Sequence, residues 1–197
     1  MKKLVIKTVV VTLAAIIAIV AALYLCFAVF APKTLANFWE GTGNYSLSVK
    51  YSEKQYERSG DISDLADLCA KLNVRTDSAR AVKYLGILVD GDGFTEFCEN
   101  TEGSGYIMTP YEYYYGAFTV ATYYESGLTP AIIVAKKAVL GGYTANNAFY
   151  LLLADADTLT NADGEIIAAE INGIKGELSD AEKTIAEKDI AIALSIK

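Results

Sequence analysis

The stretch "GNYSLSVKYSEKQYERSGD", residues 43–61, contains a triplet that returns later in the chain. Val49-Lys50-Tyr51 precedes Val82-Lys83-Tyr84 by 33 residues, and Gly60 precedes Gly93 by the same interval. A repeat of this length is typical of stacked helical hairpins, because one hairpin cannot bury its own apolar face. The interval therefore predicts an all-α fold in which this stretch forms the second helix of a repeating hairpin.

The segments that precede the two triplets also match one another. The matched pairs are Leu35-Ala36 with Leu68-Cys69, Trp39 with Leu72, Asn44 with Asp77, and Ser48 with Ala81. A small residue such as Ser48 lets two helices approach closely, and larger side chains fill the remaining gap. With its Gly43-Asn44-Tyr45 turn, this unit resembles the tetratricopeptide repeat. The resemblance implies an α-solenoid of degenerate hairpins over roughly residues 32–140, and an unrelated all-helical bundle is the alternative.

Helical patterns continue to the end of the chain. A third unit is expected over residues 113–142, where Gly127 ends one helix and Ala131, Ala135 and Ala138 recur at helical spacing in the next. Residues 90–109 precede it as an insertion with a short helix of its own. Further helices are expected in residues 144–157, 163–174 and 178–196. In the last of these, Ser179 and Glu182 have the spacing of a capping box, and this helix is expected to cap the solenoid.

The N-terminal segment is uncharged from Thr8 to Ala31. About 20 apolar residues cross a bilayer as a helix, whereas the apolar part of a signal peptide has about 7–15. The length favours an uncleaved signal anchor over residues 1–31, embedded in the lipid bilayer through residues 8–31. A cleaved signal peptide is the alternative. Residues 32–197 are then expected to form a helical-repeat domain.

The charges flanking this segment predict its orientation. Lys2, Lys3 and Lys7 precede it and only Lys33 follows closely, so the N-terminus is expected in the cytoplasm and the domain outside, at a bacterial cell surface. All 24 acidic residues follow the segment, whereas four of the 17 basic residues lie at or before Lys33, which leaves the residues after Lys33 a net charge of −11. Such a domain is expected to repel nucleic acid.

Composition excludes several kinds of catalytic and metal site. The chain has no histidine, which removes the commonest general base and most zinc and haem sites. The three cysteines lack metal-ligand spacing, although a Cys69–Cys98 disulfide is an open alternative to buried thiols. Residues 159–170 resemble an EF-hand calcium loop but begin with Leu159, so we expect a turn in which Asp163 caps a helix beginning at Glu165. We therefore expect that the protein is not an enzyme and that it binds neither a metal ion nor a cofactor.

Tyrosines supply the candidate binding residues. Fourteen occur, and "YEYYYG" at residues 111–116 is the densest group. Tyrosines of this kind either fill a core or line a groove that grips an extended peptide, since amphipathic aromatic residues are favoured in recognition surfaces. The candidate partner contacts are Tyr111, Tyr113, Tyr114, Tyr115, Lys136 and Lys137.

The expected function is that of a membrane-tethered, non-catalytic scaffold that binds a protein or peptide. This expectation comes largely from the repeat resemblance, since tetratricopeptide folds usually serve as scaffolds. An accessory protein that binds an envelope polymer or carbohydrate through acidic residues and tyrosines is the alternative.

Overall fold

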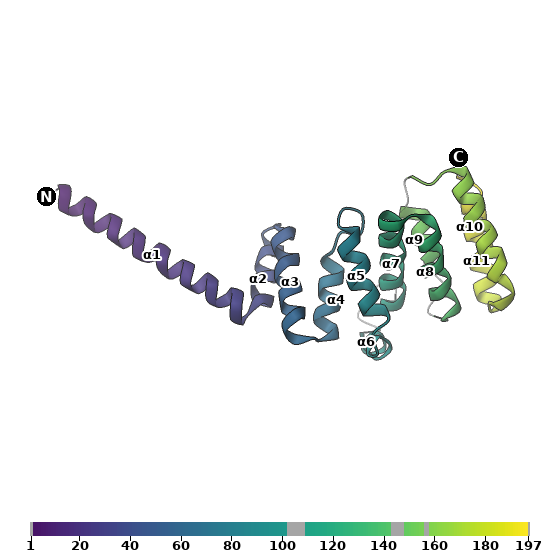
Figure 1. Cartoon of the computed structure of the whole chain (residues 1–197), viewed down its shortest axis with the longest axis horizontal. Coiled ribbons are helices and arrows are strands. Elements are labelled where there is room, and N and C mark those ends of the chain that lie inside the picture. Colours follow the sequence, from purple (N-terminus) through teal and green to yellow (C-terminus); the bar gives the residue numbers. More distant parts are fainter. Residues whose placement is uncertain (1, 102–108, 143–147, 156–157, 197) are drawn as a thin grey trace. The chain divides into compact units, whose positions relative to one another are not determined.

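The computed structural model describes residues 2–101, 109–142, 148–155 and 158–196. The secondary structure within these ranges is helical throughout, so the all-α prediction is confirmed (Figure 1). The elements are α1 (Lys2–Phe30), α2 (Pro32–Gly41), α3 (Tyr45–Ser59), α4 (Ile62–Lys71), α5 (Ser78–Val89), α6 (Phe94–Thr101), α7 (Pro110–Ser126), α8 (Leu128–Leu140), α9 (Ala148–Asp155), α10 (Asn161–Ile174), the 3-10 turn η1 (Lys175–Glu177) and α11 (Asp180–Ala193).

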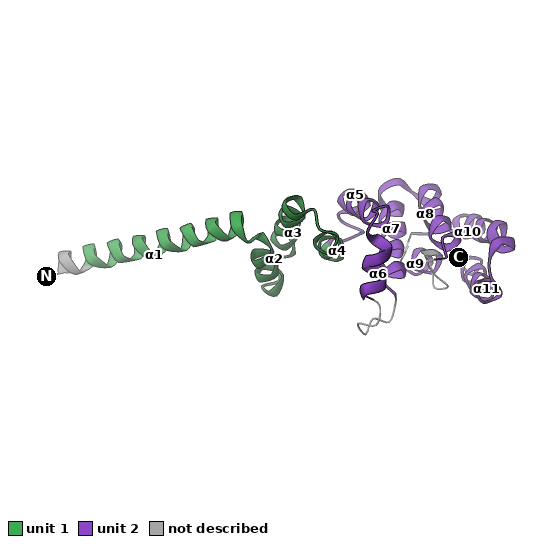
Figure 2. Ribbon diagram, turned by 90° about the horizontal axis from the view of Figure 1, so that it is seen from below, with its two compact units in different colours: residues 1–71 green, residues 72–197 purple. Residues whose placement is uncertain are grey.

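Contacts divide the chain into two compact units. Unit 1 comprises residues 1–71 and unit 2 comprises residues 72–197 (Figure 2). The boundary between them lies inside the predicted 32–197 domain, and unit 1 includes helix α1 as well as α2, α3 and α4.

Unit 1 is built around α3, which packs against α2 on one side and against α4 on the other. Helix α3 begins where the Asn44 side chain accepts a hydrogen bond from the Leu47 amide at 3.3 Å. It ends at Gly60, whose φ of 63° is a left-handed conformation that glycine adopts without steric cost. Ser48, the predicted close-contact residue, is fully buried. The sequence signals around 43–61 therefore set both ends of this helix.

The end of α1 is part of the core of unit 1. Ala28 is buried in a cluster with Leu35, Ala36 and Tyr51, and Trp39 packs against this cluster. Residues of the anchor segment thus contribute to the packing of the first hairpin.

Helix α1 is long and apolar enough to cross a membrane. Among the described residues, Ile6–Phe30 is the candidate span, with 25 residues and a mean hydropathy of 2.8. Its apolar side chains are exposed around most of the helix; Ile6, Ile17 and Leu25, for example, are each at least 60% exposed.

Unit 2 is organised around α7, which packs against α5, α8 and α9. Gly127 separates α7 from α8, as predicted, and Ala131, Ala135 and Ala138 of α8 are all buried. Small side chains along this face let α8 lie close to its neighbours. The expected short helix of the insertion is α6.

Helices α10 and α11 pack against each other, and they contact α8 and α9 respectively. The predicted capping box of α11 is confirmed, because Ser179 accepts a hydrogen bond from the Glu182 amide and Glu182 accepts one from the Ser179 amide. The predicted start of α10 is wrong. The helix begins at Asn161, and Thr160 is its N-cap, in a capping box with Asp163 as the third helical residue.

The physical reason for this difference is the spacing of Thr160 and Asp163. Both residue types are good N-caps, but a carboxylate three residues after a threonine completes a reciprocal pair of hydrogen bonds. Asp163 Oδ2 accepts from the Thr160 amide at 2.8 Å, and these hydrogen bonds hold the pKa of Asp163 below its usual value. The Asp163 carboxylate is thus occupied by the helix start.

Candidate functional site

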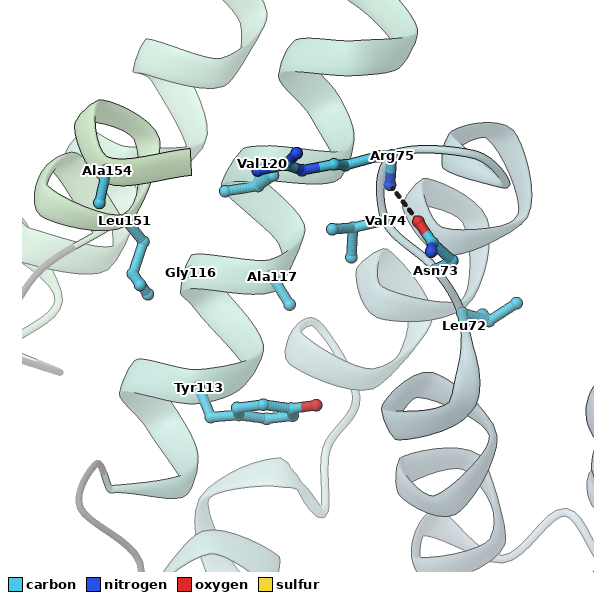
Figure 3. Close-up of a pocket in the computed structure, with 10 residues that line it drawn as sticks. All are labelled: Leu72, Asn73, Val74, Arg75, Tyr113, Gly116, Ala117, Val120, Leu151 and Ala154. Carbon is cyan, nitrogen blue, oxygen red and sulfur yellow. Dashed lines mark hydrogen bonds between the residues drawn. The ribbon is translucent and has the colours of Figure 1, made fainter. Parts of the chain in front are cut away.

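The candidate site is a pocket of about 530 Å³ in unit 2. Its size falls in the range of about 300–1,000 Å³ that is usual for ligand sites. The walls come from one face of α7, from α9 and from the segment between residues 72 and 75 (Figure 3). The lining residues are Leu72, Asn73, Val74, Arg75, Tyr113, Gly116, Ala117, Val120, Leu151 and Ala154.

One stripe of α7 forms the longest wall of the pocket. Residues three or four positions apart on a helix lie on the same face. This spacing relates the four pocket-lining residues of α7, which are Tyr113, Gly116, Ala117 and Val120. The helix is positioned from its start, where Thr109 and Glu112 form a capping box and Pro110 occupies the first turn. The apolar character of the stripe makes this wall suitable for side chains rather than for ions.

Gly116 allows α9 to lie close to α7. A Cβ atom at this position would stand 2.0 Å from Leu151 Cδ1, which is far inside van der Waals contact. The Leu151 side chain therefore occupies the space that a larger residue would need (Figure 3). A glycine inside a run of large aromatic residues is the sequence signal for such an approach, although the repeat pattern gives it no role.

The segment between α4 and α5 forms the polar rim. Asn73 Oδ1 accepts hydrogen bonds from the amides of Arg75 and Thr76, each at 3.0 Å, in an Asx turn. The Arg75 guanidinium lies 5.9 Å from the centroid of the Tyr124 ring, within reach of a cation–π interaction. The pocket thus combines apolar walls with one cation and the hydroxyl of Tyr113 (Figure 3).

The structure separates the four candidate tyrosines. Tyr113 lines the pocket and is 43% exposed. Tyr114 and Tyr115 are buried, and both lie edge-on to Phe94 of α6. The hydroxyl of Tyr111 donates to the carbonyl of Thr95 at 3.2 Å. Three of the four tyrosines therefore hold α6 against α7, while Tyr113 forms part of the pocket wall.

The two candidate lysines form ion pairs with different elements. Lys136 Nζ lies 2.8 Å from Glu170 Oε2 of α10, and Lys137 pairs with Asp90 at the end of α5. Neither lysine lines the pocket. Partner binding by these two lysines and by the tyrosines stays a prediction, and Tyr113 is the member of the set with the best placement for it.

Among the buried titratable groups outside the pocket, Cys69 and Asp189 have pKa values that burial raises strongly. Burial raises the pKa of the Cys69 thiol to about 12, which keeps it protonated and unreactive. Cys69 and Cys98 are both buried, and neither belongs to a disulfide, so the alternative of a Cys69–Cys98 bridge is wrong. Burial also raises the pKa of Asp189 to about 6. In the described parts of the chain, no group of three His, Cys, Asp or Glu side chains is arranged to hold a metal ion.

Comparison of the chain with protein-family models, with curated proteins and with solved structures finds no match.

Proposed function

We propose that this protein is a membrane-tethered, non-catalytic scaffold that binds an extended segment of a protein or peptide partner in the unit 2 pocket. The observation that carries the proposal is the apolar, side-chain-sized pocket bounded by the Gly116 face of α7 and the Asx turn at Asn73. An extended segment would place an apolar side chain against Ala117 and Val120, and the Arg75 rim favours an acidic neighbour.

A repeat architecture similar to the tetratricopeptide repeat is part of this proposal. Its support is that the matched positions 33 residues apart are similarly buried. Ser48 and Ala81 are both fully buried, and Tyr51 and Tyr84 are both buried. Folds of this kind expose long surfaces for partner segments.

The exposure of the apolar side chains of α1 supports the proposal that this helix tethers the protein to a membrane. Apart from its last turn, the apolar side chains of this 25-residue segment are largely uncovered, and so large an exposed apolar surface requires lipid or another apolar partner. Burial of Ala28 in the first hairpin argues that α1 stays attached rather than being removed with a signal peptide. The lysines before the span favour an extracytoplasmic domain at a bacterial cell surface.

A peptide partner is preferred to a carbohydrate on the chemistry of the walls. Of the ten lining residues, Tyr113 alone is aromatic, and most of the others are aliphatic. The chain also lacks histidine, which supports a binding role over catalysis.

Site-specific photo-crosslinking tests this proposal in the full chain. A benzophenone amino acid replaces Tyr113 at the pocket or, as a matched control, Ile133, an exposed residue of α8 outside the pocket. We expect a partner crosslink from position 113 that is absent from position 133 and is lost when Ala117→Trp fills the pocket. The same crosslinks from both positions, or crosslinks unchanged by Ala117→Trp in a folded protein, would contradict the proposal.

A further inference from the structure

We infer that the outer boundary of the bilayer hydrocarbon meets α1 at Tyr24, and that the α2–α3 hairpin overlaps the phospholipid headgroup layer. The inference rests on the proposed role of α1 as a membrane span. It goes further because it assigns to the hairpin a lipid-contacting surface of its own.

The first observation is that polar groups of α3 cover the last turn of α1. Lys54 Nζ donates to the Ala28 carbonyl at 2.5 Å, and the Arg58 guanidinium donates to the carbonyls of Val29 and Phe30 at 3.1 and 2.7 Å. The last carbonyls of a helix have no partner within the helix, so these cations complete the helix end. Ammonium and guanidinium groups are costly inside hydrocarbon, and residues 28–30 must therefore lie outside it.

The second observation is a tyrosine pair one turn earlier on α1. The hydroxyls of Tyr24 and Tyr51 are 2.6 Å apart, and the two rings meet edge to face with centroids 6.2 Å apart. Tyrosine side chains favour the level of the headgroups, where the ring is in apolar surroundings and the hydroxyl is solvated. The tyrosine pair therefore marks the level at which α1 passes from the hydrocarbon into the headgroup layer.

Helix length is consistent with this boundary. A hydrocarbon core of about 30 Å takes about 20 helical residues at about 1.5 Å each. Counted back from Tyr24, such a span reaches the fifth residue and leaves Lys2 and Lys3 on the other side. Lys7 then lies within reach of the opposite interface through its flexible side chain.

The connection between α1 and the hairpin is too short to let the hairpin move far from the membrane surface. Helix α1 ends at Phe30 and α2 begins at Pro32, so Ala31 is the whole connection. The six residues after Tyr24 project about 9 Å beyond the hydrocarbon. A headgroup layer is about 5–7 Å thick, and a helix with its side chains is about 10 Å across. Because α2 also packs back onto Ala28, the hairpin overlaps the headgroups.

Charge and exposure of unit 1 suit this position. Residues 32–71 carry five basic and six acidic residues, whereas residues 72–197 carry nine basic and 18 acidic ones. The part of the chain next to the lipid is therefore nearly neutral. Phe30 and Phe38 are also highly exposed, as 72% and 56% of their surfaces are uncovered. An interfacial layer accepts such rings more readily than water does.

The single tryptophan of the chain, Trp39 of α2, reports the position of the hairpin directly. The full-length protein is reconstituted in vesicles of phosphatidylcholine that carries bromine on the acyl chain either near the headgroup or near the bilayer centre. We expect a larger loss of Trp39 fluorescence with the shallow bromines than with the deep ones. No loss with either lipid, or an equal or greater loss with the deep bromines, would overturn the inference.

A second tryptophan position separates this inference from the proposed span. In a Trp39→Phe, Leu13→Trp variant the reporter lies near the middle of α1, so the deep bromines should quench it most strongly. If that variant is unquenched, the proposed membrane span fails. If it is quenched while Trp39 is not, the span stands and the interfacial position of the hairpin is wrong.

Changes in α3 test the contacts that hold the hairpin to α1. The double variant Lys54→Ala, Arg58→Ala removes the donors to the last turn and should reduce the shallow quenching of Trp39. Lys50→Ala, at an exposed position of the same helix, should leave it unchanged. Equal quenching in the wild type and both variants would overturn the assigned contacts.

Discussion

Ser48 and Ser52 lie one turn apart on α3 and are both buried, yet their hydroxyls have different surroundings. Ser48 Oγ has no hydrogen-bonding partner among the described residues. Ser52 Oγ lies 3.3 Å from both Asp67 Oδ2 and Lys71 Nζ, and that lysine also pairs with Asp67 at 2.6 Å. A buried hydroxyl without a partner costs free energy, whereas one inside a polar network stabilises the fold.

These two serines give opposite predictions for the same substitution. Ser48→Ala should raise the free energy of unfolding by about 1 kcal/mol, since it removes an unsatisfied hydroxyl and improves helix propensity. Ser52→Ala should lower it by about 1 kcal/mol. Urea unfolding of the full chain in detergent, followed by Trp39 fluorescence, measures both. A destabilising Ser48→Ala would mean that its hydroxyl makes a bond in solution.

Asp189 adds a pH dependence to the stability of unit 2. Its pKa is about 6 in the folded protein, because burial disfavours the carboxylate, against a usual value of 3.8. The folded state therefore holds this proton more tightly than the unfolded state does. The contribution of Asp189 to the free energy of unfolding is therefore fully present below about pH 4 and is lost as the pH rises through about 6.

Asp189→Asn should remove this dependence. We expect the variant to exceed the wild type in stability at pH 7 by roughly 2–3 kcal/mol, with the gap closing as the pH falls toward 4. Thermal unfolding of the full chain by circular dichroism from about pH 4 to about pH 7 provides the measurement. A gap that stays constant across this range would show that Asp189 titrates normally.

At the scale of elements, the α10–α11 pair depends on one close backbone approach. A Cβ atom on Gly164 of α10 would stand 2.2 Å from the carbonyl oxygen of Ala193, at the end of α11. Because the obstacle is backbone, a rotamer change cannot relieve it. At Gly173, in the same helix, a Cβ atom would meet no other described atom within 4 Å.

The two glycines form a matched pair for mutagenesis. Gly164→Ala should destabilise unit 2 by about 1–3 kcal/mol, because α11 must move away from α10. Gly173→Ala should stabilise it by about 0.5–1 kcal/mol through helix propensity. The melting temperatures of the two variants, each compared with that of the wild type, test this prediction. Equal shifts would argue against the close approach of α10 and α11.

At the scale of the whole molecule, local signals predicted the helices better than the site. The helix end at Gly127 and the Ser179–Glu182 capping box are local chemistry, and the structure has both. The α7 stretch is ambiguous, because tyrosines at the same spacing suit a core and a groove equally well. The packing of α6 against α7 places Tyr114 and Tyr115 in the core, and this packing depends on contacts between residues distant in sequence.

The sequence does not predict the pocket, because its walls come from segments that are distant in sequence. Its walls combine the Leu72–Arg75 segment, a stripe of α7 and residue Leu151 of α9. These segments are brought together by tertiary packing, and no local pattern links them. Tyr113 belongs to the set of candidate partner contacts expected from the sequence, whereas the other nine residues that line the pocket do not.

Orientation is a property of the whole molecule, and the lysines at the N-terminus predict it. With the N-terminus in the cytoplasm, protease added to spheroplasts should degrade the domain that follows α1 without lysis. Protection of the domain until the membrane is dissolved would reverse the orientation.

The central claim is that α1 remains attached as the membrane anchor of a domain whose core includes Ala28. The most direct test is the intact mass of the chain recovered from membranes washed at alkaline pH, which strips peripheral proteins. We expect the mass of the membrane-bound species to include the residues of α1. A shorter species in the soluble fraction, lacking the residues up to Ala31, would contradict it.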